Sequence, residues 1–296
     1  MLAHAKRSAV IAVLFLQSLS VAQQTTPAKS ADAYAIRYKL QPGQTLVSKV
    51  SHFAETKTRM AEHDEASSSR TISTKVWEVQ SVDADGNMTF EYRIDAVNLA
   101  QSVGDGEELK YNSQTDAEAP DVFRSVAETI SKPLATVTIN PQGQVIARDK
   151  ESLAPVMGIG ELTLPLPADP VAIGGQWNVP RELRVKLESG SFKTIKVREL
   201  YTLEKVSAGV ATIRVETQPL TPVNDPAVES QLIQQLSKGT IKFDLDNGRL
   251  ISKELAWSDE VVGFRGPDTS LRYDAEWTEE LQVEASRTAS ATTKKR

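Results

Sequence analysis

Two stretches of alternating hydrophobic and polar positions repeat along this chain. "WEVQSVDADGNMTFEY" covers residues 77–92 and "YTLEKVSAGVATIRVE" covers residues 201–216, which is 124 residues later (201 − 77). In each stretch apolar and polar side chains alternate with a period of two, which is typical of half-buried strands. A turn that contains glycine separates the two strands. The pattern therefore predicts the same β-hairpin twice.

A predicted amphipathic helix follows each hairpin. Pro120 precedes a run with Val122, Val126 and Ile130, and Pro226 precedes one with Val228, Leu232 and Leu236; the offset is 106 residues (226 − 120). A spacing of four places the three apolar residues of each run on one helical face. Proline is accommodated in a first helical turn, and Asp225 before Pro226 is a favourable amino-terminal cap.

The order of elements continues to match after the helices. Further hairpins are predicted at 136–149 and 240–254, the latter around Asn247-Gly248, and Gly-Gln elements stand earlier at 41–46 and 173–178. We therefore predict a mainly β protein with a few helices (α+β), built as a tandem duplication of a curved antiparallel sheet unit. Each copy has one amphipathic helix before its last hairpin. The predicted boundaries are repeat 1 at 34–150, a Pro/Leu-rich junction at 151–170 and repeat 2 at 171–285.

The amino terminus has the pattern of a signal peptide. Lys6 and Arg7 precede an apolar run from Ala9 to Leu19, and Ser20-Val21-Ala22 suits signal peptidase. The run is shorter than the roughly 20 residues that span a bilayer. We expect a signal peptide at 1–22, a flexible linker at 23–33, a disordered tail at 286–296, and no transmembrane helix after signal removal. The predicted location is periplasmic or secreted.

Composition narrows the chemistry. The chain has no cysteine, so disulfides, thiolate metal sites and lipoprotein-type lipidation are not expected, and a bacterial envelope is favoured. Charged residues make up 25% of the chain and its net charge is −5, a balance that argues against nucleic acid as a partner.

Candidate metal ligands have simpler interpretations. The sequence Asp83 to Asn87 ("DADGN") imitates the start of a calcium loop, but the twelfth position is Ile94 where an acid is required. We therefore expect a hairpin turn. His63 lies between Glu62 and Asp64 in an acidic, serine-rich stretch, which we interpret as a solvated hairpin tip because neighbouring strand residues point to opposite faces.

No catalytic set stands out. A Gly-x-Ser-x-Gly motif and a phosphate-binding glycine loop are absent, and after signal removal only His52 and His63 remain as histidines. Carboxylates are plentiful, so an acid pair for glycoside hydrolysis stays open. The pairs Asp259-Glu260 and Glu279-Glu280 are predicted to face solvent. We assign no catalytic, cofactor-binding or metal-ligating residue, expect no cofactor, and predict that the protein is not an enzyme.

Apolar and aromatic faces are the most distinctive remaining feature. Leu271, Tyr273, Ala275 and Trp277 alternate on one face of a predicted strand. These residues, with Trp177 and Trp257, either belong to an ordinary core or line a ligand cavity of roughly 300 Å³ or more.

Three segments support a family resemblance: "YKLQPGQTL" at 38–46, "PVAIGGQW" at 170–177 and "TPVNDPAVESQLIQQLSKGTIKFDLDNGRLISKE" at 221–254. The chain resembles uncharacterised exported β-rich two-repeat proteins of planctomycete-type bacteria, a domain of unknown function. The resemblance covers nearly all of the predicted mature chain and implies a fold but no activity or site residue. The predicted order of helix and sheet is also similar to the periplasmic lipoprotein carrier fold.

Taken as an expectation, the function is that of an exported, non-enzymatic cell-envelope protein that binds an apolar small molecule or another envelope component. Two alternatives stay open. One is a carboxylate-dependent hydrolase of envelope glycans or lipids, and the other is a purely structural envelope protein. The ligand-binding residues and the oligomeric state are not predicted.

Overall fold

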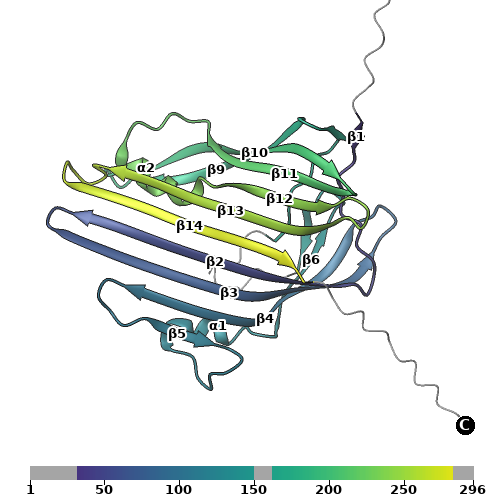
Figure 1. Cartoon of the computed structure of the whole chain (residues 1–296), viewed down its shortest axis with the longest axis horizontal. Coiled ribbons are helices and arrows are strands. Elements are labelled where there is room, and N and C mark those ends of the chain that lie inside the picture. Colours follow the sequence, from purple (N-terminus) through teal and green to yellow (C-terminus); the bar gives the residue numbers. More distant parts are fainter. Residues whose placement is uncertain (1–31, 150–161, 283–296) are drawn as a thin grey trace, which may run out of the picture. The chain divides into compact units, whose positions relative to one another are not determined.

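The computed structural model describes residues 32–149 and 162–282, and this part of the chain is mainly β, as predicted. The predicted signal peptide (1–22), the tail (286–296) and much of the linker and junction lie outside the described residues. A large antiparallel sheet carries most of the strands (Figure 1). Its first six strands are β2 (Thr45–Met60), β3 (His63–Val82), β4 (Met88–Val103), β5 (Leu109–Asn112), β6 (Pro133–Ile139) and β7 (Val145–Arg148).

The remaining six strands of the sheet come from the second half of the chain. They are β9 (Gln176–Lys186), β10 (Phe192–Ser207), β11 (Val210–Pro219), β12 (Lys238–Asp244), β13 (Arg249–Val262) and β14 (Thr269–Leu281). A separate two-stranded sheet pairs β1 (Ala33–Tyr34) with β8 (Val171–Ala172).

The large sheet is continuous across both halves of the chain. Its order is β7-β6-β4-β3-β2-β14-β13-β12-β11-β10-β9, and β5 pairs with β4. The order β2-β3-β4-β6-β7 in the first half therefore matches β9-β10-β11-β12-β13 in the second. Strand β14 joins the halves by pairing with β13 on one side and β2 on the other, and Figure 1 shows β13, β14, β2 and β3 side by side.

The two predicted hairpins are present and share local details. In the β3–β4 hairpin Val79 pairs with Phe90, and in the β10–β11 hairpin Leu203 pairs with Ile213. The register then shifts by one residue in each long strand, at Gln80 in β3 and at Glu204 in β10. Such an extra residue in one strand is a β-bulge.

A glycine before the first strand of each half makes the same contact. The Gly43 amide donates to the Val79 carbonyl at 2.8 Å, and the Gly174 amide donates to the Leu203 carbonyl at 2.7 Å. Both glycines have positive φ, at 78° and 85°, a conformation that glycine adopts without a steric penalty. The two halves thus share strand order, bulge position and this entry turn.

The acidic turns close hairpins, as expected. Asp83 Oδ1 accepts hydrogen bonds from the amides of Asp85 at 2.9 Å and Asn87 at 2.8 Å. In the β12–β13 turn, Asp244 Oδ1 likewise accepts a hydrogen bond from the Asn247 amide, at 2.9 Å. These Asx turns mimic a backbone turn. In the described part of the chain no group of three or more histidine, aspartate or glutamate side chains could hold a metal ion.

The second predicted helix forms as α2 (Pro226–Leu232), followed by the 3₁₀ turn η2 (Ile233–Gln235). Asp225 caps it as predicted, because its side chain accepts a hydrogen bond from the Ala227 amide at 2.9 Å. Val228 and Leu232 are buried against Val185, Ile195 and Val197 of β9 and β10.

The first predicted helix is shorter than expected, and the prediction that Val122 points inward is wrong. The 3₁₀ turn η1 (Asp121–Phe123) and the single turn α1 (Arg124–Ala127) replace it. Val122 is 47% exposed, whereas Phe123 is fully buried and Val126 is buried as expected. A 3₁₀ turn has three residues per turn, so the four-residue spacing that begins at Val122 does not describe this segment. None of the helices in 32–149 and 162–282 is long and apolar enough to cross a membrane.

The main core lies on one face of the sheet and includes residues of both halves. The segment 36–40, which precedes β2, packs into it through Ile36, Tyr38 and Leu40. The Tyr38 amide donates to the Pro141 carbonyl at 2.8 Å, and the Lys39 amide donates to the Gly248 carbonyl at 3.0 Å. The amino-terminal segment therefore joins the β6–β7 turn of the first half to the β12–β13 turn of the second.

Candidate functional site

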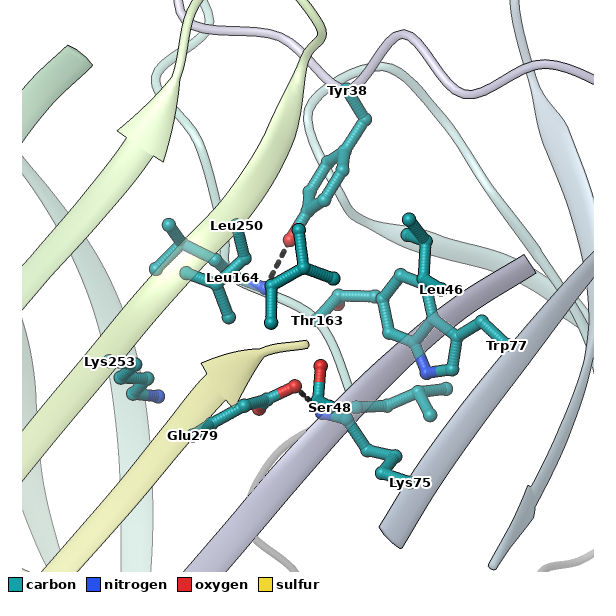
Figure 2. A pocket seen from close by; sticks show the side chains of 12 residues that line it. Tyr38, Leu46, Ser48, Lys75, Trp77, Thr163, Leu164, Leu250, Lys253 and Glu279 are labelled. Atoms are coloured by element: carbon teal, nitrogen blue, oxygen red, sulfur yellow. Dashed lines mark hydrogen bonds and ion pairs between the residues drawn. The ribbon is translucent and has the colours of Figure 1, made fainter. Parts of the chain in front are cut away.

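A small, partly open cavity lies where the central strands meet the covering segments (Figure 2). It offers about 30 Å³ to the centres of water-sized molecules, which is room for about two waters because one needs roughly 10–15 Å³. The lining combines apolar walls with polar groups: Leu46, Trp77, Leu162, Leu164, Leu250 and Leu281, and Tyr38, Ser48, Lys75, Thr163, Lys253 and Glu279.

A buried ion pair between Lys75 and Glu279 lies at one side of this cavity (Figure 2). Their side chains are only 4% and 5% exposed. Lys75 comes from β3 and Glu279 from β14, and the intervening strand β2 places Ser48 opposite Lys75. The small serine side chain leaves space for the lysine stem to reach across β2.

A second buried lysine faces the same carboxylate. Lys253 on β13 is directly opposite Glu279 in the antiparallel register and is 8% exposed. Burial lowers the pKa of Lys75 below its ordinary value, the ion pair with Glu279 opposes this effect, and the charge of Lys253 lowers the pKa further. A buried charge lowers the stability of the fold unless it is paired with an opposite charge and hydrogen-bonded. Three ionisable groups in one core therefore need partners of this kind.

Two buried tyrosines belong to the same environment. Burial raises the pKa of the Tyr38 phenol well above its ordinary value, against the hydrogen bond from the Leu164 amide, and the charge of Glu279 adds to the increase. Burial and the charge of Glu279 also raise the pKa of Tyr92. Both phenols therefore stay neutral at neutral pH and act only as hydrogen-bonding groups.

Trp77 contributes a donor that has no partner among the described residues. Its ring stacks on Phe90 with a centroid distance of 4.2 Å, and it is 6% exposed. The Lys75 ammonium lies 5.5 Å from the Trp77 ring centroid, within the range of a cation–π contact. Trp77 Nε1 is buried without a hydrogen bond, and so is Ser73 Oγ two residues before Lys75. Most buried polar groups are paired. Arg249 Nε and Trp257 Nε1 are the other buried side-chain atoms of the described residues without a hydrogen bond, and of these four residues Trp77 alone lines the cavity.

The segment 162–166 covers the cavity and is held by hydrogen bonds. The Leu164 amide donates to the Tyr38 hydroxyl at 2.9 Å, and the Thr163 hydroxyl donates to the Gly143 carbonyl at 2.7 Å. Trp177 Nε1 donates to the Pro165 carbonyl at 3.1 Å. Gly143 permits this close approach, because a Cβ there would lie 2.4 Å from the Leu164 carbonyl oxygen. We call residues 162–166 the covering strap.

The expectation that Glu279 faces solvent was wrong. Glu279 is 4% exposed, whereas its neighbour Glu280 is exposed. The alternation of Tyr273, Ala275 and Trp277 continues to position 279, so the phase of the strand already indicated an inward carboxylate. Asp259 and Glu260 are exposed, as expected.

Neither histidine of the described residues lines this cavity. His63 is exposed at the start of β3, directly after the β2–β3 turn, which confirms the hairpin-tip interpretation. His52 is half-buried on β2 and meets the Trp257 ring edge-on at a centroid distance of 6.4 Å. Burial lowers the pKa of His52.

The aromatic residues for which both an ordinary core and a cavity lining were open lie away from this cavity. Tyr273 is in a smaller cluster with Ala54, Ile233, Val261 and Ala275, and Trp257 packs against that cluster. The ring of Trp177 stacks on that of Tyr201 at 5.3 Å. Trp277 lies below the Lys253 ammonium, with 5.5 Å between the nitrogen and the ring centroid. None of these four aromatic residues lines the cavity beside Lys75.

Comparisons with known proteins give few matches. No protein-family model matches the chain, and no curated protein matches its sequence. One similar solved structure is described as "lipid-protein interactions in lipovitellin", with a TM-score of 0.46 and 12% sequence identity. The match covers 82% of this chain and 25% of that one, so this chain spans about a quarter of the length of the lipovitellin chain.

Proposed function

We propose that this protein is an exported, non-enzymatic binding protein and that its ligand has an apolar part that enters the cavity beneath the covering strap. The observation that carries this proposal is the buried, unpartnered Trp77 Nε1 donor beside Lys75, within walls made largely of leucine. A core that serves packing alone gains nothing from an unsatisfied buried donor, which costs about 1–3 kcal/mol. A ligand would supply both the acceptor and the apolar contacts.

Binding of a whole ligand requires the covering strap to move. The cavity admits about two waters, whereas small-molecule sites are roughly 300–1,000 Å³. Leu164 and Leu166 are the buried apolar residues of the strap. Their displacement would expose the leucine walls, and a ligand tail would take the volume that they leave.

A binding role is favoured over a carboxylate-dependent hydrolase by the composition of the cavity. Such hydrolases use two carboxyl groups on opposite sides of the bond that is cleaved. Of the described residues that line the cavity, Glu279 alone carries a carboxylate, and it is paired with Lys75.

The binding proposal is tested by titrating the protein with a fluorescent fatty-acid probe. We expect saturable binding, at least tenfold weaker binding in Ser48→Leu, which fills the cavity, and tighter binding in Leu164→Ala, which weakens the strap. Ser207→Leu, the same change at an exposed strand end, is the matched control and should bind like the unmodified protein. Absence of saturable binding in the unmodified protein and in Leu164→Ala would overturn the proposal.

The origin of the fold and the export of the protein belong to the same proposal. The same strand order, the same bulge position and a glycine with the same hydrogen bond before the first strand of each half support a tandem duplication of one sheet unit.

Export is supported by the sequence of residues 1–22, which lie outside the described part. Amino-terminal sequencing of the protein from its own cells tests it: we expect Gln23 as the first residue, and a retained Met1 would contradict export.

A further inference from the structure

We propose that the ligand of this cavity is a carboxylic acid with an apolar tail, and that its carboxylate binds Lys75 in competition with Glu279. This inference rests on the proposed function and adds the chemistry of the ligand head. Figure 2 shows Lys75, Glu279, Ser48 and Trp77 gathered at one side of the cavity, with leucine side chains around them.

The donors match a carboxylate in number and kind. An ammonium group has three donors, and the ion pair with Glu279 is the interaction that fixes Lys75 in the absence of a ligand. Trp77 Nε1 is donor-only, 94% of its residue surface is buried (6% exposed), and it has no partner in the described ranges. A carboxylate has two oxygens, so one can accept from Lys75 and the other from the indole.

The size and charge of the cavity favour a carboxylate over larger or neutral heads. Space for about two waters matches a three-atom carboxylate more closely than a five-atom phosphate head. A neutral hydroxyl head brings no charge to a site where hydrogen bonds to charged groups are about twice as strong as neutral ones. Lys253, opposite Glu279, adds a second positive charge to the same wall.

Glu279 acts as an internal substitute for the ligand head. Its carboxylate holds Lys75 while the covering strap is closed, and an incoming carboxylate must displace it. The isosteric change Glu279→Gln removes that competing charge, so it should tighten carboxylate binding. A purely structural ion pair predicts the opposite, because its loss would only loosen the cavity.

The test measures affinities of octanoate, octan-1-ol and octyl phosphate for the full chain by isothermal titration calorimetry. Octanoate should bind at least tenfold tighter than octan-1-ol. Glu279→Gln should tighten octanoate binding about tenfold without changing octan-1-ol, and Lys75→Met should weaken octanoate at least tenfold. The double variant Lys75→Met/Glu279→Gln removes both charges together, so it remains interpretable if Lys75→Met does not fold. It should reduce the preference for octanoate over octan-1-ol at least tenfold, and Lys253 supplies the preference that remains.

Glu280→Gln, on the exposed face of the same strand, is the matched control and should leave all affinities unchanged. Equal affinities for octanoate and octan-1-ol in the unmodified protein would overturn the carboxylate assignment and leave the apolar binding function in place. Tighter binding of octyl phosphate than octanoate would also overturn it. Failure of all three compounds to bind any variant would overturn the binding function itself.

Discussion

Strands β3 and β10 hold the same place in the two halves but carry different chemistry on their core faces. Both strands follow the first strand of their half, and both have a bulge, after Val79 in β3 and after Leu203 in β10. In each strand the carbonyl of that residue accepts a hydrogen bond from the glycine that precedes the first strand of the half. At positions 124 residues apart (195 − 71), β3 presents Thr71, Ser73 and Lys75 where β10 presents Ile195, Val197 and Glu199. All six are buried. Two of the three positions are therefore polar in β3 and apolar in β10, and the third carries a buried charge in both strands.

The apolar lining of β10 belongs to a satellite core. Ile195 and Val197 pack with Val228 and Leu232 of α2 in one cluster. In the first half, Phe123 and Val126 of the shorter helical segment join the main core instead. Because Ile195 and Val197 fill the places of Thr71 and Ser73, the fold does not require polar side chains at those two positions, and their presence in β3 points to a role beyond folding.

The two buried charges also differ in their partners. Glu199 accepts hydrogen bonds from Arg181 at 2.6 Å and from the Tyr201 hydroxyl at 2.7 Å. Arg181 lies on the edge strand β9 and its side chain is 40% exposed. Lys75 instead finds its partner on the central strand β14, and both side chains are almost fully buried. The Glu199–Arg181 pair is therefore partly exposed at the sheet edge, whereas the Lys75–Glu279 pair lies in the interior.

The largest expected effect tests this contrast. Glu279→Ala should lower the free energy of unfolding by about 3–5 kcal/mol, because it leaves the Lys75 ammonium buried without its carboxylate. Glu199→Ala should cost less, because water can hydrate Arg181. Urea denaturation measures both.

The double variant Lys75→Met/Glu279→Leu is the control for the first prediction. It replaces the ion pair with apolar side chains of similar size and should recover most of the lost stability. Equal costs for Glu279→Ala and Glu199→Ala would contradict the distinction between an interior and an edge pair.

The helical segments allow a second comparison. Leu232→Ala in α2 should destabilise the protein by about 2–5 kcal/mol through lost burial and a residual cavity. Val122→Ala should change stability by no more than about 0.5 kcal/mol, because Val122 is exposed. Thermal or urea denaturation decides the point, and a large effect of Val122→Ala would show that the predicted amphipathic helix forms in solution after all.

Local sequence signals predicted the parts of the fold that depend on near neighbours. The hairpins at 77–92 and 201–216, the Asx turns at Asp83 and Asp244, and the Asp225 cap all follow from residues within a few positions. The site does not, because it joins strands that are distant in sequence: β14 pairs with β2, so Glu279 meets Lys75. Strand phase alone indicated that Glu279 points inward, but not which charge it meets.

The cap of α2 gives a third, smaller effect. Asp225→Ala should cost about 1 kcal/mol, because the Ala227 amide loses its acceptor. Asp121→Ala in the first half should have less effect, since the turn there has no side-chain cap. Chemical denaturation of the two variants compares them directly. Similar losses would mean that Asp121 stabilises its turn through charge rather than through a cap.

The smallest expected effect concerns Ser73, the β3 residue that corresponds to Val197. Its hydroxyl is buried without a hydrogen-bond partner in the described part of the chain. Ser73→Ala removes that unsatisfied group at little loss of volume, so it should raise the free energy of unfolding, by up to about 1 kcal/mol.

Ser68→Ala on the same strand is the matched control. Ser68 Oγ lies 2.9 Å from Ser102 Oγ, and loss of that hydrogen bond should lower stability by about 0.5–1.5 kcal/mol. Opposite signs in urea denaturation would show that β3 keeps an unpaired polar group at a cost to stability, as a binding surface would. A destabilising Ser73→Ala would instead show that the hydroxyl is satisfied within the fold, and the contrast between β3 and β10 would then be one of packing alone.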